Sequence, residues 1–190
     1  NWQLGQHDIA ASIRLDDDER FGTEPSGQVA WGWAITPAFR LSVGYGHSFR
    51  APNFNQLFSP GFGGLFAGNP DLEPETANSY EVGLRYQQAN QSIDIRLYQN
   101  DLDDLIDFSG TDFQAINIAE ARTRGIEFSY LWSPQDWRIQ AQYTLQDAEN
   151  QDSNTELLRR PDHKASLTLE RRLGEGHWIG REIIEGGERN

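Results

Sequence analysis

The sequence has no cysteine and no methionine, and it has no long apolar run. Without cysteine there are no disulfides, no cysteine-based zinc sites and no thiol nucleophile. Without methionine there is no initiator residue, so we expect the chain to begin inside a longer protein. No stretch reaches the ~18 consecutive apolar residues of a transmembrane helix, and the first residues do not resemble a signal peptide. A transmembrane β-barrel is not excluded, because only every second residue of its strands faces lipid.

Basic residues are scarce as well. The chain has 16 lysines and arginines against 29 aspartates and glutamates, which gives a net charge of −13 and a pI near 4.6. Because such a field repels the phosphate backbone, the composition argues against nucleic-acid binding. Hydrophobic residues make up 37% of the chain and the mean hydropathy is −0.69, so the core of a soluble domain of this length would be thin.

Apolar and polar residues alternate along most of the chain, as expected where one face of a sheet meets an apolar medium and the other a polar one. The clearest run is residues 39–50, where Leu41, Val43 and Tyr45 alternate with small or polar residues. The pattern predicts about nine strands, in or near residues 7–15, 29–35, 39–50, 80–86, 93–98, 126–132, 137–145, 167–169 and 177–184.

The connections between these strands alternate in length. Short ones are expected at residues 36–38, 87–91, 133–136 and 174–176, and long ones at 16–27, 51–78, 100–112 and 146–162. Short periplasmic turns and long extracellular loops alternate in outer-membrane barrels. We therefore predict an all-β fold, an antiparallel up-and-down transmembrane barrel wall of about nine or ten strands, open at both edges. The first strand would run outward. A soluble β-sandwich binding module would also show alternating strands, but it has no reason to segregate its loops by length.

The positions of aromatic residues favour the same orientation of the strands across the membrane. Trp33, Phe39, Trp132 and Trp137 each lie within about two residues of a predicted short turn, where an aromatic girdle at the periplasmic interface would lie. Ordinary aromatic pairs flanking hairpins would give the same pattern.

Four segments resemble the TonB-dependent receptors of the bacterial outer membrane. They are residues 48–58 (SFRAPNFNQLF), 68–75 (GNPDLEPE), 80–84 (YEVGL) and 117–127 (NIAEARTRGIE), in the family's order and spacing. Within the family, residues 98–106 (YQNDLDDLI) and 157–160 (LLRR) most resemble the vitamin B12 (cobalamin) transporters. Pro52, Pro70 and Pro74 would stiffen the long loop, and Gly125 is expected to mark a bulge or a close contact.

The resemblance covers nearly the whole chain and implies a single partial barrel domain over residues 1–190. Such barrels have 22 strands and a plugged lumen, so about nine strands are less than half of the wall. The plug, with its TonB-contacting segment, would precede the chain, and the closing strands would follow it. The implied location is the outer membrane of a Gram-negative bacterium, and the implied partners are outer-membrane lipid, lipopolysaccharide and, through the plug, the TonB system.

Arg159 is the one ligand contact that the resemblance implies, since the first arginine of the corresponding run in cobalamin transporters reaches the bound corrinoid. Its five fixed N–H donors suit amide carbonyls and a phosphate. A rim arginine that pairs with Asp162 or with a lipopolysaccharide phosphate is the alternative. Residues 161–163 (PDH) depart from the transporters' run and are commoner in the wider family, which leaves a siderophore open as the substrate.

Other polar clusters predict no metal, cofactor or catalytic site. The acidic run at residues 16–19 is more often a solvated loop tip than a calcium site. The histidines at positions 7, 47, 163 and 177 show no ligand spacing. His47 and Ser48 are strand neighbours that point to opposite faces, so they form no dyad. We therefore expect no enzyme, but part of a transporter for energy-coupled uptake of cobalamin, or alternatively of a ferric siderophore.

Overall fold

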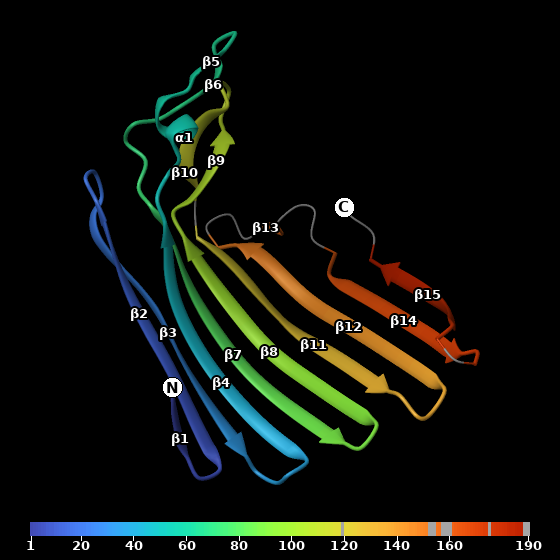
Figure 1. The fold of residues 1–190 in the computed structure, drawn as a ribbon. Helices are drawn as coiled ribbons and strands as arrows, with labels where there is room; N and C mark the ends of the chain where they lie inside the picture. The colour runs from blue at the N-terminus through green and yellow to red at the C-terminus, as the bar shows by residue number, and fades with distance from the viewer. Residues whose placement is uncertain (119, 152–154, 157–160, 175, 188–190) are drawn as a thin grey trace.

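The computed structural model describes residues 1–118, 120–151, 155–156, 161–174 and 176–187. They form one large, curved and open antiparallel sheet (Figure 1). Its strands are, in spatial order, β1 (Trp2–Leu4), β2 (His7–Asp18), β3 (Gly22–Ala34), β4 (Phe39–Arg50), β7 (Glu75–Gln88), β8 (Gln91–Asp103), β11 (Ala121–Trp132), β12 (Trp137–Asn150), β14 (His163–Arg172) and β15 (Trp178–Gly186). A short strand, β13 (Thr155–Glu156), pairs with β12 beside this path. The predicted all-β, open, antiparallel meander is confirmed.

All nine predicted strands are present, and most are longer than predicted. From β2 to β12 the strands of the meander have 12 to 14 residues. The pairing of β4 with β7 runs without interruption from Phe39 opposite Tyr86 to Arg50 opposite Glu75. Since each strand is paired over nearly its whole length, the backbone groups inside the sheet are satisfied by the ladders.

One predicted long loop is wrong, and another begins later than predicted. At residues 16–27, β2 and β3 continue past the apolar stretch to Asp18 and Gly22, and a turn of three residues joins them. The side chain of Asp18 closes this turn by accepting hydrogen bonds from the backbone N–H of Arg20 and Phe21, at 2.8 and 3.1 Å. At residues 100–112, β8 continues to Asp103 and a separate hairpin follows. In both places the strand pairing continues beyond the apolar alternation. The alternation ends earlier because here both faces of the strands carry polar residues.

Short turns lie at one end of the sheet, and the longer connections lie at the other end together with the three-residue turn between β2 and β3 (Figure 1). At one end, short turns join β3 to β4, β7 to β8, β11 to β12 and β14 to β15. At the other end, the connections after β4 and β8 fold together into what we call the loop cap, residues 51–74 and 104–118. The cap contains α1 (Phe54–Phe58), β5 (Pro60–Phe62), β6 (Leu65–Ala67), β9 (Leu105–Ser109) and β10 (Gln114–Ile118). No helix in the described ranges is long and apolar enough to cross a membrane.

The loop cap has a small apolar core of its own. Leu57, Leu72 and Ala115 are buried in it, and Ile106 and Phe108 pack against them. Phe21 joins this core from the tip of the β2–β3 hairpin, where Arg20 lies over the ring of Phe58 at 5.5 Å. Three connections that are far apart in sequence therefore pack into one structure. The sheet has little such core, so the cap contains the main buried apolar cluster of the described residues.

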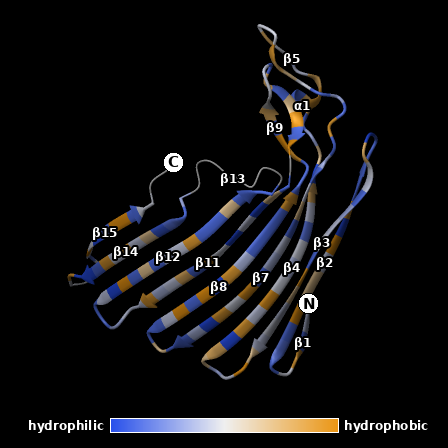
Figure 2. Cartoon of the chain, turned by 180° about the vertical axis from the view of Figure 1, so that it is seen from behind, coloured by the Kyte–Doolittle hydropathy of each residue, from blue (hydrophilic) through white to orange (hydrophobic). Residues whose placement is uncertain are grey.

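The two faces of the sheet differ in chemistry, and Figure 2 shows the alternation along every long strand. Two neighbouring rows of the convex face are Ile9, Trp31, Val43, Val82, Leu97, Ile126 and Leu145, and Trp33, Leu41, Leu84, Ile95, Phe128 and Tyr143. Two rows of the concave face are Asp8, Gly32, Ser42, Gly83, Arg96, Glu127 and Thr144, and Arg40, Arg85, Asp94, Ser129 and Gln142.

Candidate functional site

The convex face presents a continuous apolar band. No part of the chain that the structure describes packs over this band, and Val82, Leu97 and Leu145 are 44%, 51% and 47% exposed. Along β12 the band runs over nine residues from Trp137 to Leu145, which span about 26 Å of strand. A folded protein leaves a large apolar patch bare to water only rarely, so the band has the character of a surface that contacts a membrane or another protein.

Aromatic side chains border this band. Near the short turns, Phe39 and Tyr86 pair with their ring centroids 4.8 Å apart, and Arg171 lies over the ring of Trp137 at 5.1 Å. Toward the loop cap, Tyr45 and Tyr80 pair at 5.2 Å. The predicted girdle residues therefore lie close to the short turns, and the tyrosine pair forms a second aromatic border at the other side of the band.

Beyond the tyrosine pair, β7, β8 and β11 carry polar residues on the convex face, outside the apolar band, whereas β2 carries Ile13 and Leu15 there. Asp101 and Arg122 are direct cross-strand partners there, and their side chains are joined at 2.6 Å. Partial burial acts to raise the pKa of Asp101, but hydrogen bonds from Arg122 and Gln99 outweigh it, so this pKa is lowered. The Asp101 carboxylate stays charged at neutral pH as part of a polar rim.

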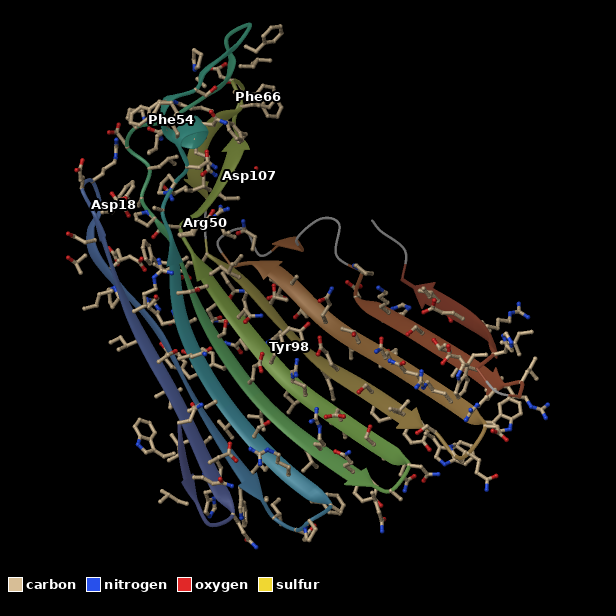
Figure 3. All side chains as sticks on the ribbon, in the orientation of Figure 1. Asp18, Arg50, Phe54, Phe66, Tyr98 and Asp107 are labelled. Atoms are coloured by element: carbon tan, nitrogen blue, oxygen red, sulfur yellow. The ribbon has the colours of Figure 1, made fainter. Side chains whose placement is uncertain are left out.

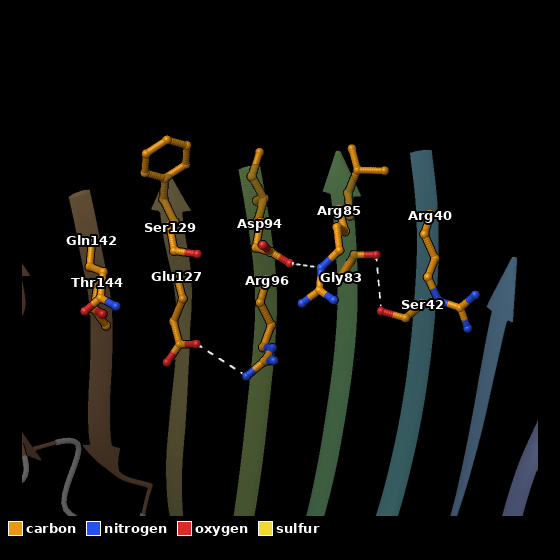
Figure 4. Close-up of a pocket in the computed structure, with 13 residues that line it drawn as sticks. Arg40, Ser42, Gly83, Arg85, Asp94, Arg96, Glu127, Ser129, Gln142 and Thr144 are labelled. Carbon is orange, nitrogen blue, oxygen red and sulfur yellow. Dashed lines mark hydrogen bonds and ion pairs between the residues drawn. The ribbon is translucent and has the colours of Figure 1, made fainter. Parts of the chain in front are cut away.

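The concave face contains a polar hollow of about 500 Å³ (Figure 4). Its wall carries three arginines with carboxylate partners: Arg40 with Asp8, Arg85 with Asp94, and Arg96 with Glu127 at 3.6 Å and with Glu81 at 3.9 Å. Each arginine is about half exposed, so solvent screens these pairs and each contributes little stability. The wall is thus a polar, hydrogen-bonding surface that leaves room for another polar layer.

Gly125 lies on the concave face, where the ring of Tyr98 covers it. A Cβ atom at this position would lie 2.8 Å from the Tyr98 hydroxyl and 2.5 Å from the backbone oxygen of Leu145. The Tyr98 hydroxyl donates to Oε1 of Gln146 at 3.2 Å, which holds the ring across the strand. The pairing of β11 is regular through Gly125 on both sides, so the glycine marks a close contact and not a bulge.

At the base of the loop cap, one carboxylate joins three strands. Glu75 begins β7, and its side chain accepts hydrogen bonds from Nε of Arg50 at 2.6 Å and from Nη2 of the same arginine. It also accepts the backbone N–H of Ile106 in β9 at 2.8 Å. Only 9% of Glu75 is exposed. The hydrogen bond to Glu75 raises the pKa of the Arg50 guanidinium, which lies at the cap end of β4.

A second side chain joins the two halves of the cap's base. Asn117, at the end of β10, accepts the backbone N–H of Glu73 at 2.9 Å and donates to the carbonyl oxygens of Glu73 and Asp104 at 3.0 and 2.7 Å. Arg50, Glu73 with Glu75, and Asn117 belong to the segments 48–58, 68–75 and 117–127, respectively. The three sequence segments therefore meet in one hydrogen-bonded base.

The cap presents aromatic side chains and negative charge to solvent. Phe62 and Phe54 are 88% and 74% exposed, and Phe66 stacks on Phe113 with ring centroids 5.3 Å apart (Figure 3). The two segments of the cap, residues 51–74 and 104–118, contain five carboxylates and no lysine or arginine. Such a surface suits a large ligand with planar or apolar parts and hydrogen-bond donors.

The sequence-predicted site residue, Arg159, lies outside the described residues, and so do its neighbours at positions 157, 158 and 160. The carboxylates at positions 16–18 bind local partners: Asp16 pairs with Arg14, Asp17 accepts from Thr23, and Asp18 closes its turn. No group of three or more potential metal ligands gathers in the described part of the chain.

Histidine positions follow the strand pattern. His7 stacks against Trp31 and Trp33 with ring centroids 5.7 Å away in both cases, and Nδ1 of His47 lies 3.0 Å from Oδ1 of Asn78. His47 lies opposite Asn78 and Ser48 opposite Ala77, so the two alternate between faces as expected.

Sequence reasoning missed the base of the cap and the ion pairs of the hollow. The sequence did contain a signal for the base of the cap, because its charged and amide residues lie inside three of the segments that resemble the family. Nothing in the sequence pairs Arg50 with Glu75 until the register of β4 and β7 is known.

An open sheet with an apolar convex face, a polar concave face, short turns at one end and packed loops at the other has the properties of a piece of an outer-membrane β-barrel wall. Over residues 1–187 the sequence matches the model of the TonB dependent receptor-like β-barrel. The chain therefore belongs to the TonB-dependent receptor family, whose members are transporters of the Gram-negative outer membrane and not enzymes.

Solved structures show the same fold. The ferric enterobactin receptor PfeA of Pseudomonas aeruginosa aligns with a TM-score of 0.84 and 18% identity over 98% of this chain and 31% of its own. The siderophore receptor PirA of the same organism aligns with a TM-score of 0.77 and 18% identity over 96% of this chain and 37% of its own. The copper transporter OprC aligns with a TM-score of 0.75 and 24% identity over 90% of this chain and 30% of its own. The chain thus spans about a third of the length of these receptors.

Proposed function

We propose that this chain is part of the barrel of a receptor that imports cobalamin across the outer membrane, with energy supplied by the TonB system through a plug domain. The observation that carries the transport role is the two-faced sheet with its loop cap at one end. In this arrangement the apolar band contacts membrane lipid, the polar rim beyond the tyrosines contacts lipopolysaccharide, the concave hollow faces the plug, and the cap meets the nutrient outside.

Cobalamin is the first choice of nutrient. It is supported by the resemblance of residues 98–106 and 157–160 to the cobalamin transporters, in which the position of Arg159 contacts the corrinoid. The chemistry of the cap agrees with a large, weakly charged, amide-rich ligand. Exposed phenylalanines can pack against its corrin ring, and the many carboxylates can accept hydrogen bonds from its amides.

A ferric siderophore is the second candidate, favoured by Pro161 after the two arginines and by the exposed aromatic residues. The charge of the cap argues against a polyanionic ferric chelate, because residues 51–74 and 104–118 carry five carboxylates and no lysine or arginine. Copper(I) is disfavoured as cargo for this part of the receptor. Its preferred soft ligands are cysteine and methionine, and the sequence contains neither.

The test is ligand binding and uptake by the full-length receptor and its Arg159→Ala variant, with Arg171→Ala as a control at the opposite end of the sheet. We expect the wild type to bind cyanocobalamin and Arg159→Ala to weaken that binding about tenfold or more, as loss of a charge-assisted hydrogen bond does. Arg171→Ala should bind normally. Cyanocobalamin binding and uptake unchanged by Arg159→Ala would remove Arg159 from the site. A receptor that binds a ferric siderophore and no cobalamin would overturn the choice of nutrient.

A further inference from the structure

We propose that Glu75 is a positioning residue for nutrient capture, which fixes the loop cap as one rigid body on the end of the barrel wall. This inference rests on the proposed function, since it assumes that the cap meets the nutrient. It concerns a residue that contacts no ligand itself and acts through the cap that it holds.

Glu75 lies where the sheet meets the loop cap. It is the one charged residue among those described that is buried, and its carboxylate holds the ends of β4 and β7 to the start of β9. β4 and β7 are strands of the sheet, whereas β9 belongs to the cap. A buried carboxylate must have its partners, because leaving one unpaired is costly. Glu75 therefore links the cap and the sheet in one fixed geometry.

The two halves of the cap, residues 51–74 and 104–118, are joined directly to each other. Phe66 N–H donates to the carbonyl of Asp112 at 3.0 Å, and Nε2 of Gln114 donates to the carbonyl of Gly68 at 3.3 Å. The Phe66 ring contacts Phe113 and Phe108, and both halves contribute to the core around Leu57. A force or a ligand that moves residues 51–74 therefore moves residues 104–118 with them.

The consequence is pre-organisation. A surface held in its binding geometry before the ligand arrives loses less conformational entropy on binding, so its affinity is higher. If Glu75 is removed, the cap keeps its core and its contact with Phe21 of the β2–β3 hairpin, but it loses its hydrogen-bonded link to β4 and β7, so its orientation to the barrel is less tightly held. Capture at low nutrient concentration should suffer, whereas transport at saturating nutrient should not, because the wall and its hollow are unchanged.

The experiment compares Glu75→Ala, Glu75→Gln and the control Glu170→Ala in the full-length receptor. Glu170 pairs with Arg138 at 3.5 Å near the short turns, so its loss breaks an ion pair far from the cap. We expect Glu75→Ala to weaken cyanocobalamin binding about tenfold with an unchanged maximal uptake rate. Glu75→Gln keeps an oxygen for the Ile106 N–H and should stay within about threefold of wild type. Glu170→Ala should not differ from wild type.

A measurement without ligand separates this inference from the proposed function. Spin labels at Phe62→Cys, on the exposed tip of the cap, and at Asp136→Cys, in a short turn, report the position of the cap relative to the wall by their distance distribution. It should be narrow in wild type and Glu170→Ala and broad in Glu75→Ala. An unchanged distribution in Glu75→Ala, or a broad one with unchanged affinity, would overturn the positioning role. Failure of the wild type to bind cobalamin would overturn the nutrient and leave the distance test standing.

Discussion

An arginine placed on the convex face tests whether that face meets lipid. Leu84 is 39% exposed and lies one residue from the midpoint of β7 between Tyr80 and Tyr86. Its cross-strand neighbours are Leu41 and Ile95, neither of which offers a carboxylate. An arginine on the lipid face near the middle of the bilayer costs about 2–4 kcal/mol. Leu84→Arg should therefore lower the folding equilibrium constant about 30- to 1,000-fold.

The matched control is Ser129→Arg, on the concave face at nearly the same level. Ser129 lies opposite Asp94 and beside the polar hollow, so an arginine there has a carboxylate and water within reach. Its effect should stay below about 1 kcal/mol. Both variants of the full-length receptor would be unfolded with guanidinium in phospholipid vesicles and followed by tryptophan fluorescence and heat-modifiable gel migration. Equal losses for the two variants, or a larger loss for Ser129→Arg, would refute the assignment of the faces.

Two further predictions concern the sheet near the cap. Gly125→Ala should destabilise the receptor by about 1–3 kcal/mol in the same titration, because its Cβ would meet the backbone oxygen of Leu145 at 2.5 Å, which cannot rotate away; a gain of about 0.5–1 kcal/mol, as for an ordinary strand glycine, would contradict this. Arg122→Gln should destabilise the receptor by a constant amount between pH 7 and 5. Because the pKa of Asp101 is lowered in the folded state, the difference should shrink only as the pH falls below about 4, and a difference that vanishes by pH 6 would disprove the pairing.

The sequence predicted the fold because the alternating pattern and the sheet have the same physical cause. Val43 and Val82 face one medium, and Ser42 and Gly83 face another. The alternation of apolar and polar residues therefore predicts a strand wherever the two media differ. The positions of the strand ends could not be predicted from this alternation. Beyond the apolar band both faces are polar, with Asp17 and Thr23 on one face and Asp16 and Glu24 on the other, and a ladder of backbone hydrogen bonds imposes no alternation on the sequence by itself.

The functional sites were predicted less completely. The segments around Arg50, Glu75 and Asn117 were recognised by resemblance, but their contacts depend on the register of β4 with β7 and on the packing of two loops separated by about 30 residues, which no local pattern encodes. Gly125 was predicted to mark either a bulge or a close contact, and the structure shows the close contact, with the ring of Tyr98. Arg159 stays a prediction.

The most direct test of the account is a scan of β7 with an environment-sensitive fluorophore on single cysteines at residues 81–85 of the full-length receptor, in vesicles that contain nitroxide-labelled lipid. The labels at Val82 and Leu84 should be strongly quenched by the lipid nitroxide, and those at Glu81, Gly83 and Arg85 should not. This period of two is the signature of a barrel wall between lipid and a polar lumen. Uniform quenching along the strand, or none, would contradict it.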